Sequence, residues 1–479
     1  MASRRPRPEQ LARRRVAAGV VLIAAVLIVG LLAGGGGKLS SPPPGSLAHP
    51  IAGYPFNYSP SRESVFAERA IVGESQVLFT MSPGGVLATA ARVAAFRGLI
   101  DVAVRGTGID PKLLEAIVFV ESAGRPQVIA GSDPADASGL TQILAQTGQS
   151  LLGMHIDLAL SRTLTRRIDA AAAAGRARTV ARLQRRRARI DDRFDPRLAL
   201  AATVRYLELA RRDLGGRQDL AVVSYHMGIG NLEHVLELYD GGRPVPYAQL
   251  YFDTSPLERS AAWRMLNSFS DESSLYYWRV LAAEQLMQLY RTDRTALERL
   301  NSLELAYPSD AEVLDPPSRT GSFSGPSALA AAYRTRELVP LPRNPAAVGL
   351  AYAAAMGSRA RRLNAPAALY RGLRPAALAV LTEIGTLVRR IAGTRAPLTV
   401  ASSVLDARYD RLLGLEDPPA TTGYTFQIDR RYASGAQAVA FQFVLDRLQA
   451  LDLIGWIREA GTIEITVAPD AARVIAHGV

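Results

Sequence analysis

An apolar run of 18 residues, Val16 to Ala33, constrains this chain more than any other feature. It holds no charged residue, and as a helix rising about 1.5 Å per residue it measures about 27 Å, close to a bilayer core of roughly 30 Å. The run therefore predicts a transmembrane helix over residues 16–33. The alternative is a signal peptide that is cleaved near Ala33 and Gly34, and both interpretations place the following residues outside the cytoplasm.

The charges that flank this run predict its orientation. Only Lys38 follows it closely, whereas six arginines precede it: Arg4, Arg5, Arg7, Arg13, Arg14 and Arg15. Because basic flanks stay in the cytoplasm, residues 1–15 are predicted to be a cytoplasmic basic tail. We therefore expect a single-pass protein of the bacterial inner (cytoplasmic) membrane, with its N-terminus inside and its body in the periplasm or another extracytoplasmic space.

Composition divides the remaining chain into segments. Residues 34–60 are rich in Gly, Pro and Ser and predict a stalk, and residues 296–345 turn to Pro, Ser, Gly and Arg and predict a linker. Apolar residues recur at helical spacing over much of 61–295, and helix and strand patterns mix in 346–479. We therefore expect a multidomain chain with an N-terminal transmembrane helix, a mainly α domain over 61–295 and an α+β accessory domain over 346–479.

The charge and cysteine content limit the classes of partner. The chain has 479 residues, a formal charge of +12 and no cysteine, so disulfides and cysteine-based metal sites are excluded. A basic balance favours anionic neighbours such as lipid head groups or wall polymers. Aromatic residues do not alternate with basic ones as they do in proteins that stack and clamp nucleic acid, so no nucleic-acid partner is expected.

Residues 162–193 predict a basic helical insertion. Ala171 to Ala174 lead into an arginine-rich stretch in which Val180, Leu183 and Ile190 are spaced along a helix. Two interpretations stay open: the insertion is a solvated hairpin, or it contacts anionic lipid or wall polymer.

The strongest helix signal precedes Glu121. Asp110 is a good N-cap, Pro111 suits the first helical position, and an apolar face follows that ends near Ser122 to Gly124. A carboxyl group in the last turn of an apolar helix faces the negative end of the helix dipole, which disfavours its ionised form. Glu121 is therefore predicted to have the raised pKa that a general acid needs, unless it is a solvent-facing residue at a frayed helix end.

Four segments occur in a recognisable order: Leu114 to Ser122, Ala137 to Ile143, Ser224 to Leu232, and Glu272 to Tyr277. They resemble the soluble lytic transglycosylase family, whose lysozyme-like domain has an ES pair, a GLMQ segment, an AYNAG-x-GN segment and a late E-T-x-x-Y helix. The resemblance spans roughly residues 100 to 292. It implies cleavage of the β-1,4 bond between N-acetylmuramic acid and N-acetylglucosamine in peptidoglycan strands.

The resemblance also implies roles for individual residues. Glu121 would act alone as catalytic acid and base, closing a 1,6-anhydro ring on the muramic acid without water, and no cofactor or metal would be needed. The residues that match substrate-contacting positions are Ser122, Gln142, Tyr225, His226, Asn231 and Tyr276.

Three residues depart from the family pattern. Thr141 replaces the Met of GLMQ, His226 replaces an Asn and Met227 replaces an Ala, so the positioning of substrate is in question. Two alternatives therefore stay open. The chain could be a catalytically inactive wall-binding or scaffolding protein on the same fold, or a goose-type muramidase that hydrolyses the bond.

The C-terminal domain resembles zinc peptidases of the D-alanyl-D-alanine carboxypeptidase type in the segments 398–402, 422–428 and 462–467. Ala420, Gln427 and Glu464 align with the metal ligands of that pattern, and they do not restore the ligand set of two His and one Asp. The resemblance implies a domain that has lost its metal and binds stem peptides or a partner in the cell-wall machinery. The alternative is an unrelated accessory domain.

Overall fold

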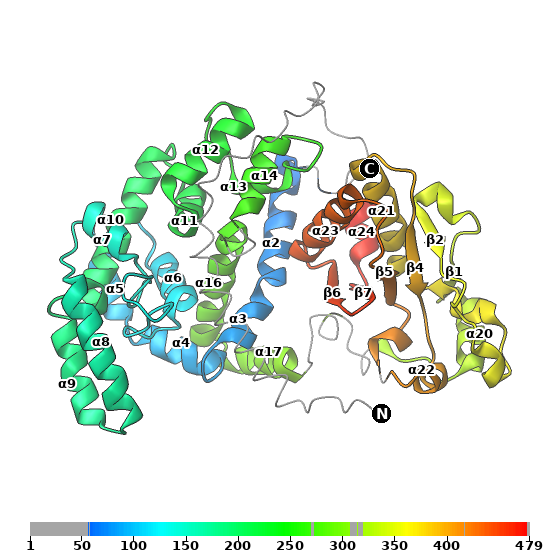
Figure 1. Cartoon of the computed structure of the whole chain (residues 1–479), viewed down its shortest axis with the longest axis horizontal. Coiled ribbons are helices and arrows are strands. Elements are labelled where there is room, and N and C mark those ends of the chain that lie inside the picture. Colours follow the sequence, from blue (N-terminus) through cyan, green and yellow to red (C-terminus); the bar gives the residue numbers. More distant parts are fainter. Residues whose placement is uncertain are drawn as a thin grey trace. The chain divides into compact units, whose positions relative to one another are not determined.

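The computed structural model describes residues 56, 58–269, 273–306, 314, 320–415 and 417–476. The predicted tail, the transmembrane helix and most of the stalk lie outside these residues. The chain forms two compact units (Figure 1). We call Ser82–Leu232 with Phe269–Arg294 the helical unit, and Ser46–Met81, Glu233–Ser268 and Thr295–Val479 the mixed unit.

The helical unit is built around α6 (Pro111–Ser122), which packs against α4, α5, α10 and α16. The other elements of the unit are α4 (Val86–Ala94), α5 (Arg97–Ala103), α7 (Ala145–Ser150), α8 (Leu158–Ala173), α9 (Ala177–Arg187), η2 (Asp192–Phe194), α10 (Pro196–Asp213), α11 (Gln218–Met227) and α16 (Tyr276–Thr292). The boundary between the units falls within α12 (Ile229–Asp240). The mainly helical fold predicted for this region is confirmed.

The start and end of α6 follow from its sequence as predicted. The Asp110 side chain accepts a hydrogen bond from the Lys112 amide at 2.8 Å, and Pro111 opens the helix. Ala123 adopts a left-handed φ of 53° and ends the helix, and Gly124 follows with φ 70°. A Cβ at Gly124 would lie 2.9 Å from the backbone nitrogen of Val93, so α4 can approach the end of α6 only because this residue is a glycine.

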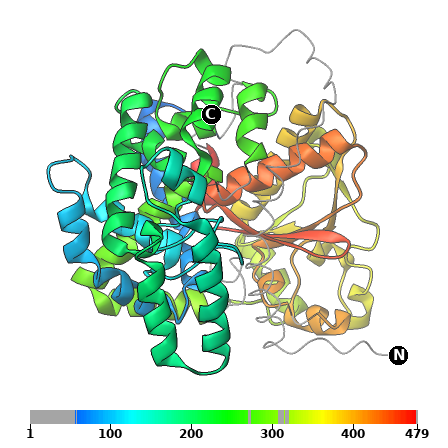
Figure 2. The same ribbon diagram turned by 60° about the vertical axis from the view of Figure 1, so that its left-hand side comes forward.

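Helices α8 and α9 pair as a hairpin that extends from the rest of the helical unit (Figure 2). Leu164, Ile168 and Ala171 on α8 are buried, whereas the outer surface of α9 is covered with arginines. The stretch predicted as a basic insertion is therefore a helical hairpin.

The mixed unit carries a five-stranded sheet in the order β2-β4-β5-β7-β6. Its strands are β2 (Leu350–Tyr352), β4 (Leu398–Ser402), β5 (Thr425–Asp429), β6 (Ile454–Arg458) and β7 (Thr462–Val467). Strands β2 and β4 are parallel and the other neighbours are antiparallel. The long helices are α21 (Pro375–Ala392) and α23 (Gly435–Ala450), which pack on each other. The predicted α+β character of the C-terminal region is confirmed.

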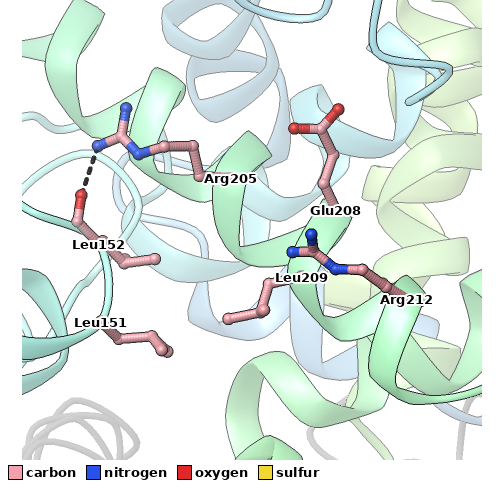
Figure 3. A pocket seen from close by; sticks show the side chains of 6 residues that line it. All are labelled: Leu151, Leu152, Arg205, Glu208, Leu209 and Arg212. Atoms are coloured by element: carbon pink, nitrogen blue, oxygen red, sulfur yellow. Dashed lines mark hydrogen bonds between the residues drawn. The ribbon is translucent and has the colours of Figure 1, made fainter.

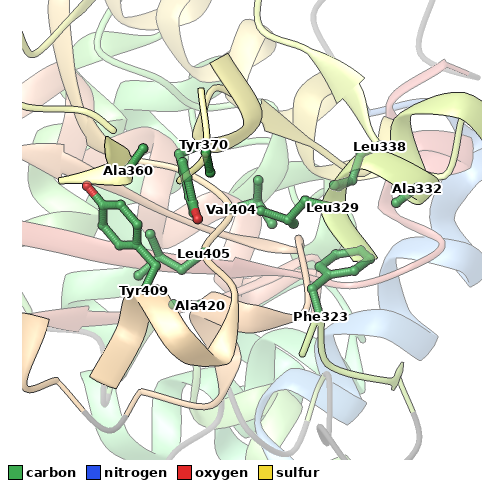
Figure 4. Packing of buried hydrophobic residues seen from close by; sticks show 11 residues of the cluster. Phe323, Leu329, Ala332, Leu338, Ala360, Tyr370, Val404, Leu405, Tyr409 and Ala420 are labelled. Atoms are coloured by element: carbon green, nitrogen blue, oxygen red, sulfur yellow. The ribbon is translucent and has the colours of Figure 1, made fainter. Parts of the chain in front are cut away.

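A separate small core lies beside this sheet in the mixed unit (Figure 4). It joins Phe323, Leu329 and Val404 with the rings of Tyr370 and Tyr409, which are tilted by 39° and have centroids 4.2 Å apart. The phenol of Tyr370 donates a hydrogen bond to Asp406 at 2.7 Å. Asp406 also caps α22 (Ala407–Leu413), so the polar groups of this core are satisfied.

Helices from earlier in the chain also belong to the mixed unit. They are α2 (Glu63–Gly73), α3 (Ser75–Met81), α13 (Tyr247–Phe252) and α14 (Ser260–Ser268). Arg447 of α23 lies 3.6 Å from the ring centroid of Tyr251 and donates to the carbonyl of Thr254. Edge-on aromatic contacts join Phe443 to Phe56 and to Trp263. These segments thus share a core with the C-terminal helices.

Two further findings bear on the predicted organisation. The stretch predicted as a linker, 296–345, contains α20 (Pro326–Thr335) and most of α17 (Arg294–Ala306). Among the described residues, no single helix has both the length and the hydropathy to cross a membrane, and segments 60–81 and 86–94 meet those criteria only when taken together. The predicted domain boundaries stay a prediction.

Candidate active site

Glu121 lies in the last turn of α6, half-buried, on a helix whose preceding residues from Leu113 to Phe119 are all buried. The other acid on this helix, Glu115, is fully buried and pairs with Arg291 and, at 3.6 Å, with Arg97. Glu115 is therefore engaged in structural ion pairs. Glu121 is the carboxyl group of α6 that remains accessible for chemistry.

Tyr276 contacts Glu121 directly. Its phenol donates a hydrogen bond of 2.6 Å to Oε1 of Glu121 across 155 residues of sequence. Tyr276 begins α16, and its side chain is 2% exposed. Burial and the adjacent carboxyl group raise the pKa of Tyr276 well above its ordinary value, so the phenol keeps its proton and remains a donor. The two ends of the α6–α16 pair are thus fixed by Tyr276 on Glu121 and by Arg291 on Glu115.

Tyr225 stands beside Tyr276, with nearly parallel rings whose centroids are 6.4 Å apart. Its phenol donates to the carbonyl of Thr141 at 2.7 Å and lies 3.1 Å from the hydroxyl of Thr203. The ring of Tyr206 meets Tyr225 edge-on at 5.2 Å. Burial, with a smaller contribution from Glu121, raises the pKa of Tyr225, so it too is a neutral phenol.

The loop that contains Gln142 is held by its own backbone. Gln142 has a left-handed φ of 49°, and its amide nitrogen donates to the carbonyls of Gly139 and Val128 at 2.8 and 3.2 Å. The family resemblance implies that Gln142 contacts substrate, and in the structure its amide nitrogen donates to backbone carbonyls. Gln142 therefore shapes the loop that receives the Tyr225 phenol at Thr141.

A buried ion pair holds the opposite side of this loop. Arg193 and Asp191 are fully buried and bonded at 2.8 Å, and the same guanidinium donates to the carbonyls of Pro134, Asp136 and Ile143. Gly139 has φ 84°, and a Cβ there would overlap the carbonyl oxygen of Arg193. The glycine of the Gly139 to Gln142 segment is therefore needed for this close approach as well as for its φ.

His226 contacts the same aromatic group from the end of α11. Its ring centroid lies 5.2 Å from that of Tyr276, and its Nδ1 is 2.8 Å from the hydroxyl of Ser273. The surrounding protein removes water from the imidazole and so disfavours its charged form, and Arg279 adds a smaller repulsion. Together they lower the pKa of His226 to about 4. His226 is therefore a neutral imidazole near pH 7.

Three residues near the ends of α6 and α11 make contacts within the protein: Ser122, Asn231 and Met227. The Ser122 hydroxyl is buried, lies 3.3 Å from the carbonyl of Val118 and accepts from the Arg125 amide. Asn231 is exposed, and its amide donates to the carbonyl of Met227 at 2.8 Å. Met227, which replaces an Ala of the family pattern, is 4% exposed. Glu272, which opens the fourth sequence segment, lies outside the described residues.

The sequence did not indicate four residues that contact Tyr225, His226 or the loop of Gln142: Thr203, Tyr206, Arg193 and Ser273. Burial raises the pKa of Tyr206 to about 12, and its phenol donates to the carbonyl of Ser224 at 2.5 Å. Tyr206 follows Thr203 by one helical turn on α10, a spacing that could have pointed to a shared face. Nothing in the local sequence indicated that Arg193 would be buried.

The structure also has a cavity of about 470 Å³ on another face of α10 (Figure 3). It is lined by Leu151, Leu152, Arg205, Glu208, Leu209 and Arg212. Arg205 donates to the carbonyl of Leu152 at 2.8 Å. None of the residues around Glu121 lines this cavity, and we place the candidate chemistry at Glu121 because the convergent hydrogen bonds are there.

Comparison with known families agrees with this assignment. Residues 98–176 match the model of the Transglycosylase SLT domain. The predicted resemblance is therefore confirmed, and SLT-domain proteins are lytic transglycosylases that act on peptidoglycan. The matched stretch holds Glu121 and Gln142, whereas Tyr225 and Tyr276 come from later residues. A search of curated proteins finds no match to the chain.

The positions aligned with peptidase metal ligands hold a polar pair in the mixed unit. Gln427 on β5 faces Glu464 on β7 in register, and its amide donates to that carboxyl group at 3.0 Å. Burial and the neighbouring Asp417 raise the pKa of Glu464 to about 8. Ala420 is buried in a short 3-10 turn. Among the described residues, no three His, Asp or Glu side chains are placed to hold a metal ion, and no comparison supports the zinc-peptidase resemblance.

Proposed function

We propose that this protein cleaves the β-1,4 bond between N-acetylmuramic acid and N-acetylglucosamine in peptidoglycan without water, and that Glu121 is its catalytic residue. The observation that carries the proposal is the hydrogen bond from the buried Tyr276 phenol to Oε1 of Glu121. This bond joins two of the four segments that resemble the family, at the end of the apolar helix α6. Residues 98–176, which hold Glu121, match the SLT domain model.

The proposed reaction uses one carboxyl group twice. Glu121 first gives its proton to the glycosidic oxygen as the bond from that oxygen to C1 of the muramic acid breaks. The resulting carboxylate then takes the proton of the C6 hydroxyl while O6 bonds to C1. The products are a free hydroxyl on the N-acetylglucosamine side and a 1,6-anhydro muramic end, so atoms and protons balance without water.

Tyr276 supports both steps in this mechanism. Because Oε1 accepts the phenol hydrogen, the acid proton of Glu121 belongs on Oε2. Once that proton has left, the same hydrogen bond stabilises the carboxylate until it accepts the C6 proton. Tyr225 and His226 flank Tyr276 with neutral side chains, so neither adds a formal charge beside the reacting carboxyl group at neutral pH.

Product analysis tests this function and separates it from the alternatives. Purified full-length protein is incubated with peptidoglycan, and the released muropeptides are identified by mass. We expect anhydro muropeptides from the wild type and none from Glu121→Gln, while Glu233→Gln, which changes an exposed acid on α12, retains activity. Products that have gained a water would instead indicate a goose-type muramidase. No product over a range of pH would indicate a wall-binding or scaffolding protein.

We also propose that residues 16–33 anchor the protein in the inner membrane with its body outside the cytoplasm. The support is the length and charge flanks of the apolar run. Cell fractionation with N-terminal sequencing tests this: an anchor keeps the run in the membrane fraction, and a mature chain that starts near Gly34 would indicate a cleaved signal peptide. Binding of stem peptides or a cell-wall partner by the C-terminal domain stays a prediction.

A further inference from the structure

The α8–α9 hairpin concentrates the positive charge of the chain. Between Leu158 and Arg189 there are ten arginines and one acidic residue, Asp169, a net charge of +9 against +12 for all 479 residues. Eight of these arginines are exposed and have no ion pair with any described residue: Arg166, Arg167, Arg176, Arg178, Arg182, Arg185, Arg186 and Arg189. Such unpaired charge repels itself and is unfavourable for folding without an anionic partner.

The arginines of α9 form a stripe along one side of the helix. Arg178, Arg182, Arg185 and Arg186 recur at helical spacing, three, four or seven residues apart or adjacent across the stripe. Val180 and Leu183, half-buried, lie on the other side of α9, where it packs on α8. The stripe extends over about 12 Å, at about 1.5 Å per residue, and presents several guanidinium groups in one direction.

The base of the hairpin is fixed to the loop at the candidate active site. Arg187, at the end of α9, is 2% exposed and stacks 3.6 Å from the ring centroid of Phe194. Its guanidinium donates to the Thr165 hydroxyl on α8 and to the Gln127 side chain, both at 2.9 Å. Gln127 begins the loop that carries Gln142. Hairpin and loop are therefore one hydrogen-bonded body, in which the stripe holds a fixed position relative to Thr141 and Tyr225.

The side chains of the hairpin narrow the choice of partner. Residues 158–189 contain no aromatic residue on which nucleic-acid bases could stack. They also present no exposed large apolar side chain that could insert into a bilayer. The exposed groups of the hairpin that can bind a polymer are therefore its guanidinium groups, which bind carboxylates through paired hydrogen bonds. In peptidoglycan the sugars are uncharged and the stem peptides carry the carboxylates.

We infer that the α8–α9 hairpin is a docking arm that binds the stem-peptide carboxylates of peptidoglycan and so holds the strand beside the Glu121 site. The inference rests on the proposed function for its choice of polymer. The arm adds affinity through repeated weak contacts along the strand, and the anchored base places that affinity next to the candidate catalytic loop.

Binding measurements test the arm separately from catalysis. The full-length protein carries Glu121→Gln so that the polymer is not consumed. Cosedimentation gives its Kd for peptidoglycan from which phosphate-containing polymers have been removed. The test variant is Arg178→Gln, Arg182→Gln, Arg185→Gln and Arg186→Gln. The matched control removes the same charge from exposed, unpaired arginines of the mixed unit: Arg334→Gln, Arg336→Gln, Arg361→Gln and Arg362→Gln.

We expect the hairpin variant to bind at least about tenfold more weakly and the control to change less than about twofold. Peptidoglycan whose carboxylates have been amidated with carbodiimide should bind the parent protein as weakly as native peptidoglycan binds the hairpin variant. Equal losses in the two variants, undiminished binding to amidated polymer, or a hairpin effect seen only with phosphatidylglycerol vesicles would each overturn the inference. Anhydro products from the wild type together with any of these results would leave the proposed function intact.

Discussion

Glu121 and Tyr276 form the contact on which the proposed chemistry depends, although they come from distant parts of the sequence. The sequence predicted both residues: Glu121 from its apolar helix and Tyr276 from a segment that resembles a family motif. It could not predict that Thr203 and Tyr206 contact Tyr225, because these contacts arise only when α10 packs beside α11. A hydrogen bond between two helices has no local signature.

Tyr276→Phe should lower kcat about 10- to 100-fold with little change in KM, because it removes the donor to the Glu121 carboxylate and keeps the ring. Steady-state assays of soluble muropeptide release measure both constants. Tyr290→Phe, which removes a phenol elsewhere on α16, serves as the control and should keep wild-type rates. Equal rates for Tyr276→Phe and wild type would remove Tyr276 from the mechanism.

His226→Gln should change how stability depends on pH. The folded pKa of His226 is about 4, below the unfolded value of about 6.5. Above pH 6.5 neither state takes up a proton here, but between 6.5 and 4 the unfolded chain does and the folded chain does not, so the wild type loses stability as pH falls. The thermal midpoint of the wild type relative to the variant should therefore drop from pH 7.5 to pH 5. A difference that stays constant with pH would contradict this.

At the scale of elements, the sequence predicted those that carry their own start and stop signals. The start and end of α6 lie where Asp110, Pro111 and the apolar spacing indicated, and β4, β5 and β7 overlap the segments 398–402, 422–428 and 462–467 noted in the C-terminal region. Gly228, with φ 89°, ends α11 before α12 begins. Helices α17 and α20 were missed because the Pro, Ser and Gly residues of 307–325 lie between them and dominate the composition of the stretch.

Gly139→Ala should destabilise the helical unit by about 2–3 kcal/mol, since its Cβ would overlap the carbonyl of Arg193 at a left-handed φ. Gly153→Ala is the matched control: it also has a positive φ but meets nothing within 4 Å, so about 1 kcal/mol is expected. Thermal unfolding followed by circular dichroism compares the two. Similar midpoints for both variants would show that the Gly139 contact does not constrain the loop.

At the scale of the whole molecule, the chain crosses between its two units several times. Helical periodicity continues through residues 61–295, and periodicity carries no information about which core a helix joins. Helices α2, α13 and α14 lie in the mixed unit. This sharing could not be predicted from the sequence because it depends on contacts such as Phe443 with Phe56.

A fragment of residues 61–295 should therefore aggregate, whereas a fragment of residues 56–476 should remain monomeric. Removal of α23 takes Arg447 away from Tyr251 and Phe252, and Phe443 away from Trp263, and so exposes apolar side chains of α13 and α14. Size-exclusion chromatography with light scattering measures the difference. A monomeric, cooperatively unfolding 61–295 fragment would show that its helices form a core of their own.

Arg69 of α2 pairs with Asp470, 401 residues later in the chain. At a synthesis rate of about 5–20 residues per second, α2 waits roughly 20 to 80 s for that partner to be made. Closing so long a loop is also slow, because its entropy is lost before the contacts form. The contact between α2 and this part of the mixed unit can therefore form only after residue 470 has been made.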